Sequence, residues 1–145
     1  MRSPAPGAFF LPMHTSKILL VPAALAALAL AGCGGGDDDG PGRTATVPAT
    51  GAIEVVGDEY SFDPETLVVE AGGSQAELEI ALRNDGALAH NLKVFRDGDE
   101  LGGTPTFQGG ETRSGRVAVT PGSYEMVCTV GNHADLGMTG TLVVR

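Results

Sequence analysis

The sequence predicts an all-β sandwich of about seven to eight short strands, on the basis of three observations. Stretches of alternating apolar and polar residues recur along the second two thirds of the chain, and turn-forming residues separate them. The composition includes 22 Gly and nine Pro but no Trp, which favours many turns and short strands. Beyond the N-terminus, no stretch shows the sustained period of an amphipathic helix. A length of 145 residues leaves room for one ordinary domain.

The alternation is clearest over residues 76–83. Leu78, Ile80 and Leu82 fall on one face at a spacing of two, with glutamates between them, as a half-buried antiparallel strand requires. The same pattern predicts strands over 53–56, 66–70, 91–95, 116–119, 124–128 and 139–144. Gly, Asn, Asp and Pro mark turns at 71–73, 84–86, 97–99, 109–110 and 120–122. Short strands at this spacing indicate a sandwich or a small barrel.

The N-terminus, residues 1–32, is expected to be an export signal. An apolar run over 18–31 follows Lys17 and is too short for a comfortable membrane span. Either Met1 or Met13 can be the first residue of the signal. The run ends in Leu-Ala-Gly-Cys33, which resembles the lipobox of bacterial lipoproteins, in which the cysteine carries the lipid. This resemblance implies a protein anchored at the outer face of the cytoplasmic membrane, in the periplasm or at the cell surface. An ordinary cleaved signal peptide, or an uncleaved apolar helix, is the alternative.

Residues 33–50 are expected to form a tether, because after Cys33 they are rich in Gly, Asp, Thr and Pro and low in apolar residues. The folded domain is therefore expected over residues 51–145. The net charge of −9 becomes −11 once the two basic residues of the leader are removed. Such an acidic protein is a poor ligand for a phosphate backbone, so nucleic acid is not expected as a partner.

Four side chains with affinity for transition metals occur in a pattern. Cys128, His133 and Met138 follow the spacing Cys-x4-His-x4-Met between two expected strands, and His90 is the only other histidine after the leader. Two imidazoles, a thiolate and a thioether are the donors of a trigonal copper site with a weak axial methionine. Taken singly, each residue also has an ordinary explanation, as a buried cysteine, a core methionine or a loop histidine. Cys33 and Cys128 have separate contexts and are not expected to form a disulfide.

The segments 62–72, 84–91, 124–128 and 137–144 resemble the cupredoxin family of plastocyanins, azurins and halocyanins. The resemblance implies a Greek-key β-sandwich with one type 1 copper ion per chain. It also implies that His90, Cys128, His133 and Met138 are the ligands, and that Asn91 links the two ligand-bearing segments by hydrogen bonds. Plastocyanins have two residues between the cysteine and the histidine, and azurins have three before the methionine. The loop geometry of this four-and-four spacing therefore stays open.

The resemblance implies outer-sphere transfer of single electrons, and no enzyme activity, because four protein ligands leave no open position for a substrate. The expected partners are redox proteins of a respiratory or photosynthetic chain, or a copper-dependent enzyme, and the protein is expected to be a monomer. In this family an apolar patch surrounds the histidine of the ligand loop, so Leu88, Ala134 and Leu136 are the expected docking residues. The alternatives are a lipid-anchored copper chaperone or scavenger that supplies an envelope oxidase, and a metal-free interaction domain.

Overall fold

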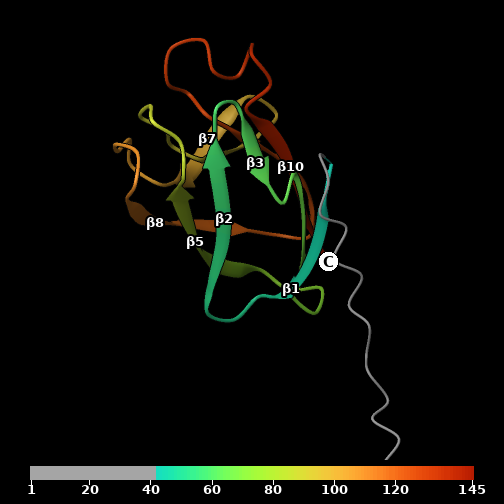
Figure 1. Ribbon diagram of the computed structural model, residues 1–145. Coiled ribbons are helices and arrows are strands. Elements are labelled where there is room, and N and C mark those ends of the chain that lie inside the picture. The colour runs from blue at the N-terminus through green and yellow to red at the C-terminus, as the bar shows by residue number, and fades with distance from the viewer. Residues whose placement is uncertain (1–41) are drawn as a thin grey trace, which may run out of the picture. The chain divides into compact units, whose positions relative to one another are not determined.

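The computed structural model describes residues 42–145, which fold into ten strands (Figure 1). The strands are β1 (Thr44–Pro48), β2 (Ala52–Asp58), β3 (Ser61–Asp63), β4 (Thr66–Glu70), β5 (Ala76–Asn84), β6 (Lys93–Arg96), β7 (Asp99–Gly103), β8 (Thr112–Val119), β9 (Gly122–Val127) and β10 (Thr139–Val144). Within this part of the chain, no helix is long and apolar enough to cross a membrane. The predicted leader, the predicted lipidation site Cys33 and the part of the predicted tether up to residue 41 lie outside the described residues.

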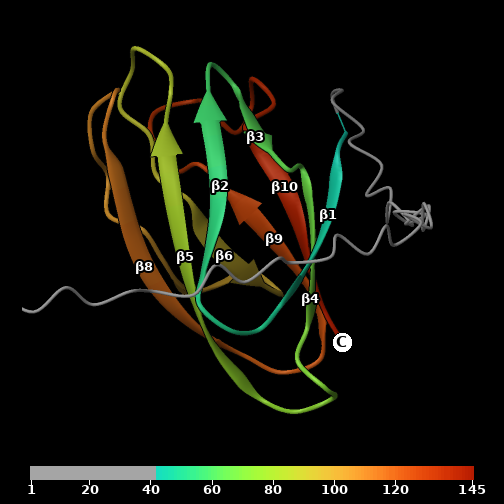
Figure 2. The same ribbon diagram turned by 60° about the horizontal axis from the view of Figure 1, so that its bottom comes forward.

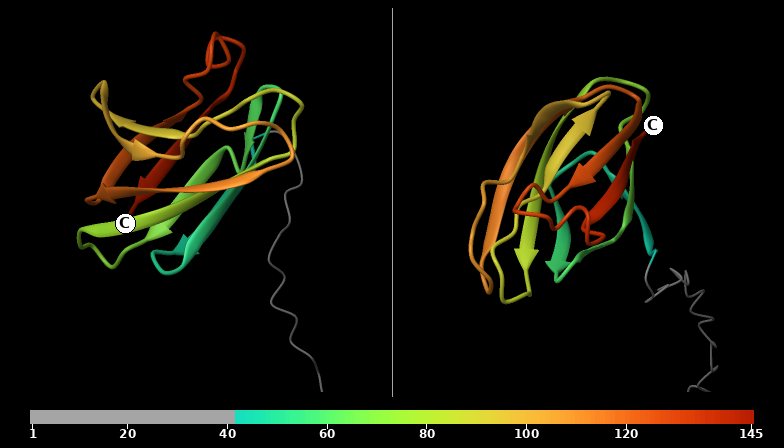
Figure 3. Two further views of the ribbon diagram at one scale, coloured as in Figure 1. Left: turned by 90° about the vertical axis from the view of Figure 1, so that its left-hand side faces the viewer. Right: turned by 90° about the horizontal axis from the view of Figure 1, so that it is seen from above.

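The strands form two packed layers. They are hydrogen-bonded in the order β1-β4-β10-β9-β6-β7-β8-β5-β2-β3, with β2 parallel to β5 and β10 parallel to β4. The ladder folds over, so that β2, β5 and β8 lie in one layer while β4, β10, β9 and β6 lie in the other (Figures 2 and 3). The prediction of an all-β sandwich is confirmed, with ten strands in place of seven or eight.

Three of the ten strands were not predicted, each for a local reason. β3 has only three residues, which is too short to show an alternating pattern. β7 has no fully buried residue and ends in two glycines, so it lacks the apolar face by which strands are recognised. A Cβ at Gly103 would lie 2.1 Å from the carbonyl oxygen of Leu92, so the close approach of β6 and β7 requires glycine there.

β1 lies within the segment that was expected to be part of the tether. We expected a tether through residue 50, whereas Thr44–Pro48 pair in parallel with β4 and alternate between exposed and half-buried positions. Thr44 and Thr141 flank the same residue of β4, Thr66, from opposite sides. Because Thr141 lies near the start of β10, which follows Met138, the chain enters the domain at the end that carries the predicted ligand loop.

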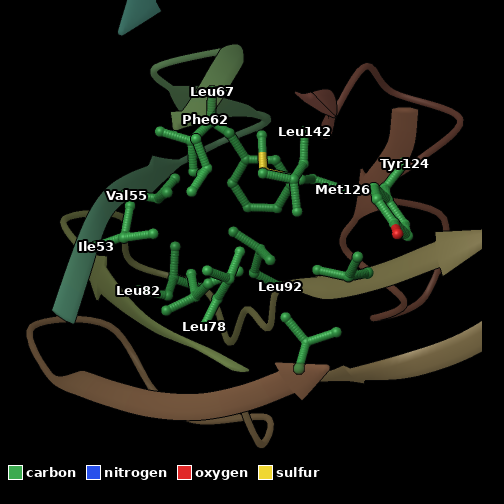
Figure 4. Close-up of a cluster of buried hydrophobic side chains, with 14 of the residues drawn as sticks. Ile53, Val55, Phe62, Leu67, Leu78, Leu82, Leu92, Tyr124, Met126 and Leu142 are labelled. Carbon is green, nitrogen blue, oxygen red and sulfur yellow. The ribbon is translucent and has the colours of Figure 1, made fainter. Parts of the chain in front are cut away.

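The core lies between the two layers and reaches the predicted metal site. Figure 4 shows side chains of both layers meeting, with Val55 and Leu82 on one side and Met126 and Leu142 on the other. All four are completely buried, and burying such a side chain stabilises the fold by roughly 1.5–3 kcal/mol. The same buried cluster includes Cys128 and Met138, so two of the predicted ligands are packed into the hydrophobic core. Remaining core members are Ile53, Phe62, Leu67, Val69, Leu78, Ile80, Leu92, Val94, Phe107, Val117, Val119, Tyr124 and Val144.

Candidate metal centre

The structure brings three of the four predicted ligands to one point. The donor atoms of His90, Cys128 and His133 all lie within 4.8 Å of one another. The two histidine Nδ1 atoms are 3.1 Å apart, and the Cys128 Sγ lies 3.9 Å from the Nδ1 of His90 and 3.7 Å from that of His133. His90 and Cys128 are buried, and His133 is 8% exposed. Two nitrogens and one sulfur therefore converge in a protected place.

His90 is fixed by its backbone and by the loop that precedes it. Its amide and carbonyl exchange two hydrogen bonds of 3.0 Å with Phe107, forming an isolated bridge. The preceding loop is closed by Asn84, which is buried. The Asn84 side chain accepts a hydrogen bond from the Gly86 amide and donates one to the Leu88 carbonyl. The segment that carries His90 is therefore held by hydrogen bonds within the protein.

The loop between β9 and β10 carries Cys128, His133 and Met138 and is likewise held by its own backbone. The Cys128 amide donates to the Met138 carbonyl at 3.1 Å, and the Met138 amide donates to the His133 carbonyl at 2.9 Å. The His133 amide donates to the Val130 carbonyl at 3.1 Å. These bonds tie the ends of the loop together beneath His133, so the donors are oriented by the protein itself.

Met138 is completely buried at the base of this loop. Its methyl group packs toward Gly57 of β2, where an added Cβ would lie 3.1 Å from it and 3.2 Å from Leu82. A side chain at position 57 would therefore crowd the methionine, so glycine at this point of β2 leaves the space that Met138 occupies.

Asn91 joins the two segments that carry ligands. Its side-chain oxygen accepts a hydrogen bond from the Thr129 amide at 2.8 Å, and its side-chain nitrogen donates to the Thr129 and Thr106 hydroxyls at 2.9 Å. Asn91 follows His90 and Thr129 follows Cys128, so these bonds fix the separation of the two ligands. Asn91 itself is buried, and removing its amide would break all three of these hydrogen bonds.

Comparison with known proteins identifies the architecture. No model of a protein family matches the sequence, and no curated protein matches it. Among solved structures, auracyanin B is 22% identical, covering 70% of this chain and 89% of its own, with a TM-score of 0.57. Auracyanin A from Chloroflexus aurantiacus, titled a "blue" copper protein, is 25% identical, covering 70% of this chain and 100% of its own, with a TM-score of 0.54. An azurin from Methylomonas sp. strain J is 16% identical over 65% of this chain and 97% of its own, with a TM-score of 0.51.

The domain has the cupredoxin fold. Its donor set fits one type 1 copper ion, because a thiolate and two imidazole nitrogens converge in a buried place, as a trigonal His₂Cys site requires. Burial lowers the pKa of His90 below its usual value, which favours the neutral ring that a metal binds.

Two residues of the predicted docking patch, Ala134 and Leu136, lie on the same loop as His133. Leu88 and Leu136 are 43% and 50% exposed, and Ala134 is half-buried. The ring of His133 also meets that of Tyr60 edge to face, with 4.9 Å between the ring centroids. Sequence reasoning did not select Tyr60, because it lies in the short turn between β2 and β3, far along the chain from the ligand loop.

Glu59 is the second neighbour of the three-donor cluster that sequence reasoning missed. Its Oε1 accepts hydrogen bonds from the amides of Ala87 and Leu88 and lies 3.5 Å from the Nε2 of His90. The hydrogen bond from the Leu88 amide is the main cause that lowers the pKa of Glu59, so the carboxylate is charged at neutral pH. Nothing in the sequence marks this glutamate, because its partners lie 28 to 31 residues farther along the chain.

Proposed function

We propose that the protein is a membrane-anchored blue-copper electron carrier, which transfers single electrons by an outer-sphere route between redox partners of the cell envelope. The observation that carries the proposal is the convergence of three buried donors on segments closed by their own hydrogen bonds. Copper bound there would supply one-electron redox chemistry. His90, Cys128 and His133 would hold it, with Met138 as the fourth, weaker ligand.

The protein's own residues suit a carrier better than an enzyme or a chaperone. None of the three donor side chains is more than 8% exposed, so a substrate has no direct access to the centre. The backbone bonds of the ligand loop keep the donors in place whatever the charge at the centre, which limits rearrangement during transfer. A copper chaperone needs ligands that open to release the ion, and buried donors in a closed loop oppose release.

The surface around His133 is the proposed exit for electrons. Leu88, Ala134 and Leu136 would provide the apolar contact, and the exposed Asp135 stands between the last two in the chain. A small apolar patch on an acidic protein suits weak and rapid docking to a basic surface. The proposed partners are therefore redox proteins whose docking face is basic.

The proposed lipid anchor at Cys33 fits the place where the chain enters the domain. β1 begins at the end that carries the ligand loop, so a tether through residues 34–43 would join the domain at its metal-bearing end. A partner embedded in the same membrane would then be within reach of the His133 surface. Incorporation of labelled fatty acid into the wild-type protein but not into Cys33→Ala would support the anchor, and equal incorporation would refute it.

The carrier and chaperone functions can be separated with a Cu(I) chelator. The full-length copper-loaded protein in detergent is reduced and reoxidised repeatedly in the presence of the chelator. An electron carrier recovers its colour in every cycle, because buried donors retain the ion. Progressive transfer of copper to the chelator would contradict the proposed carrier and favour copper delivery.

A further inference from the structure

The Nε2 of His90 is buried and makes no hydrogen bond. Among buried side-chain nitrogen and oxygen atoms of residues 42–145, it alone lacks a partner. The acceptor that lies near it is the Oε1 of Glu59, at 3.5 Å. An unpaired buried polar atom is costly, and this carboxylate is the group that can serve as the partner of the nitrogen.

Glu59 is held in place from the opposite side. The amides of Ala87 and Leu88 donate to the same Oε1 at 2.7 and 2.8 Å. Gly86 leaves room for the carboxylate, because a Cβ there would lie 2.4 Å from Oε1. The side chain is 32% exposed, so the charge is partly shielded from water but not enclosed. Glu59 thereby ties the turn after β2 to the loop that delivers His90.

The two nitrogens of His90 face different groups. Nδ1 points to the Cys128 sulfur and to the Nδ1 of His133, whereas Nε2 points to Glu59. If Nε2 carries the proton, it can donate to the carboxylate, and Nδ1 keeps a free lone pair for the metal centre. A carboxylate on the far nitrogen of a ligand histidine fixes the tautomer and makes the ligand more basic.

We propose that Glu59 is a positioning residue that holds His90 in its Nε2–H tautomer and lowers the reduction potential of copper bound at the centre. This inference rests on the proposed function. A more basic imidazole beside a negative charge favours the oxidised ion, which carries the higher charge, over the reduced one. Glu59 is therefore one determinant of which donors and acceptors the protein can serve.

The variant that tests this proposal is Glu59→Gln, with Asp58→Asn as the matched control. Glutamine keeps the shape and an oxygen that accepts from Ala87 and Leu88, but it removes the charge. Asp58 is the adjacent exposed carboxylate, and its contact is with the Ser61 hydroxyl, so its loss changes the net charge without touching His90. A difference in reduction potential between the two variants then reports the contact of Glu59 with His90, and not merely the loss of one negative charge near the centre.

We expect Glu59→Gln to weaken the binding of Cu(II) relative to that of Cu(I) by about tenfold. This change raises the reduction potential by about 59 mV for a one-electron couple. The shift in Asp58→Asn should be much smaller. Equal shifts in the two variants, or no shift in Glu59→Gln, would overturn the proposal. Either result leaves the blue-copper site itself standing, so the two proposals fail separately.

A second measurement reads the tautomer without relying on electron transfer. Nitrogen-15 NMR of the metal-free protein should show His90 protonated at Nε2, with slow exchange of that proton in the wild type. Faster exchange or a mixed tautomer is expected in Glu59→Gln. A wild-type His90 protonated at Nδ1, or an Nε2 proton whose exchange does not change in the variant, would overturn the positioning role.

Discussion

The Nδ1 atoms of His90 and His133 lie 3.1 Å apart, although 43 residues separate the two histidines in the chain. The antiparallel pairing of β6 with β9 brings them together, because His90 lies shortly before β6 and the ligand loop follows β9. Asn91 then fixes the two segments to each other through Thr129. The centre is therefore a product of strand pairing at one end of the sandwich.

The first prediction concerns the link made by Asn91. In Asn91→Ala the Thr129 amide and two hydroxyls lose their partner, so we expect the metal-free protein to lose about 1–3 kcal/mol of unfolding free energy. Chemical denaturation measures this loss. Asn132→Ala, an exposed asparagine of the ligand loop, should change stability by less than about 0.5 kcal/mol. Similar losses in the two variants would contradict the linking role.

The second prediction concerns Met138 as the fourth ligand. Met138→Leu conserves volume and should cost less than about 1.5 kcal/mol of stability. It removes the axial electron donor and leaves an apolar group, which destabilises the more highly charged Cu(II) more than Cu(I), so the reduction potential measured by voltammetry should rise. Met126→Leu makes the same change at an equally buried position of β9 and should leave the potential unchanged. If the two variants behave alike, Met138 is a core residue and not a ligand.

The third prediction concerns docking at the His133 surface. Stopped-flow electron transfer to a basic cytochrome should slow as salt is added, because the protein is acidic. Leu136→Ser should slow transfer at every salt concentration, since it removes half-exposed apolar contact area. Leu101→Ser in β7, where the leucine is 40% exposed, should have no effect. A transfer rate that does not depend on salt concentration, or equal slowing in both variants, would contradict docking at this surface.

Much of the fold was predictable because burial imposes a period of two. The strands expected at 66–70 and 139–144 have the observed bounds, and the alternating leucines and isoleucine of β5 are buried as predicted. The missed strands share a weak or absent apolar face. β1 pairs only at the edge, and its composition resembles that of the tether before it, so sequence periodicity carried no signal.

The residues of the site also differ in whether they could be predicted from local sequence or depend on contacts between distant segments. Cys128, His133 and Met138 lie in one loop, so their spacing alone indicated a metal centre. Glu59 could not be found in this manner, because its contact with His90 depends on the parallel pairing of β2 with β5, which brings the end of β2 next to the loop after β5. A single glutamate among many acidic residues has no pattern that would distinguish it.

The most direct test of the central claim is the visible absorption spectrum of the full-length protein in detergent, titrated with Cu(II) and then reduced with ascorbate. We expect an intense blue band that reaches its maximum at one copper per chain and disappears on reduction. The band should be lost in Cys128→Ser and retained in Cys33→Ala. A protein that stays colourless with Cu(II), or a band that survives Cys128→Ser, would contradict the assignment of a thiolate–copper centre.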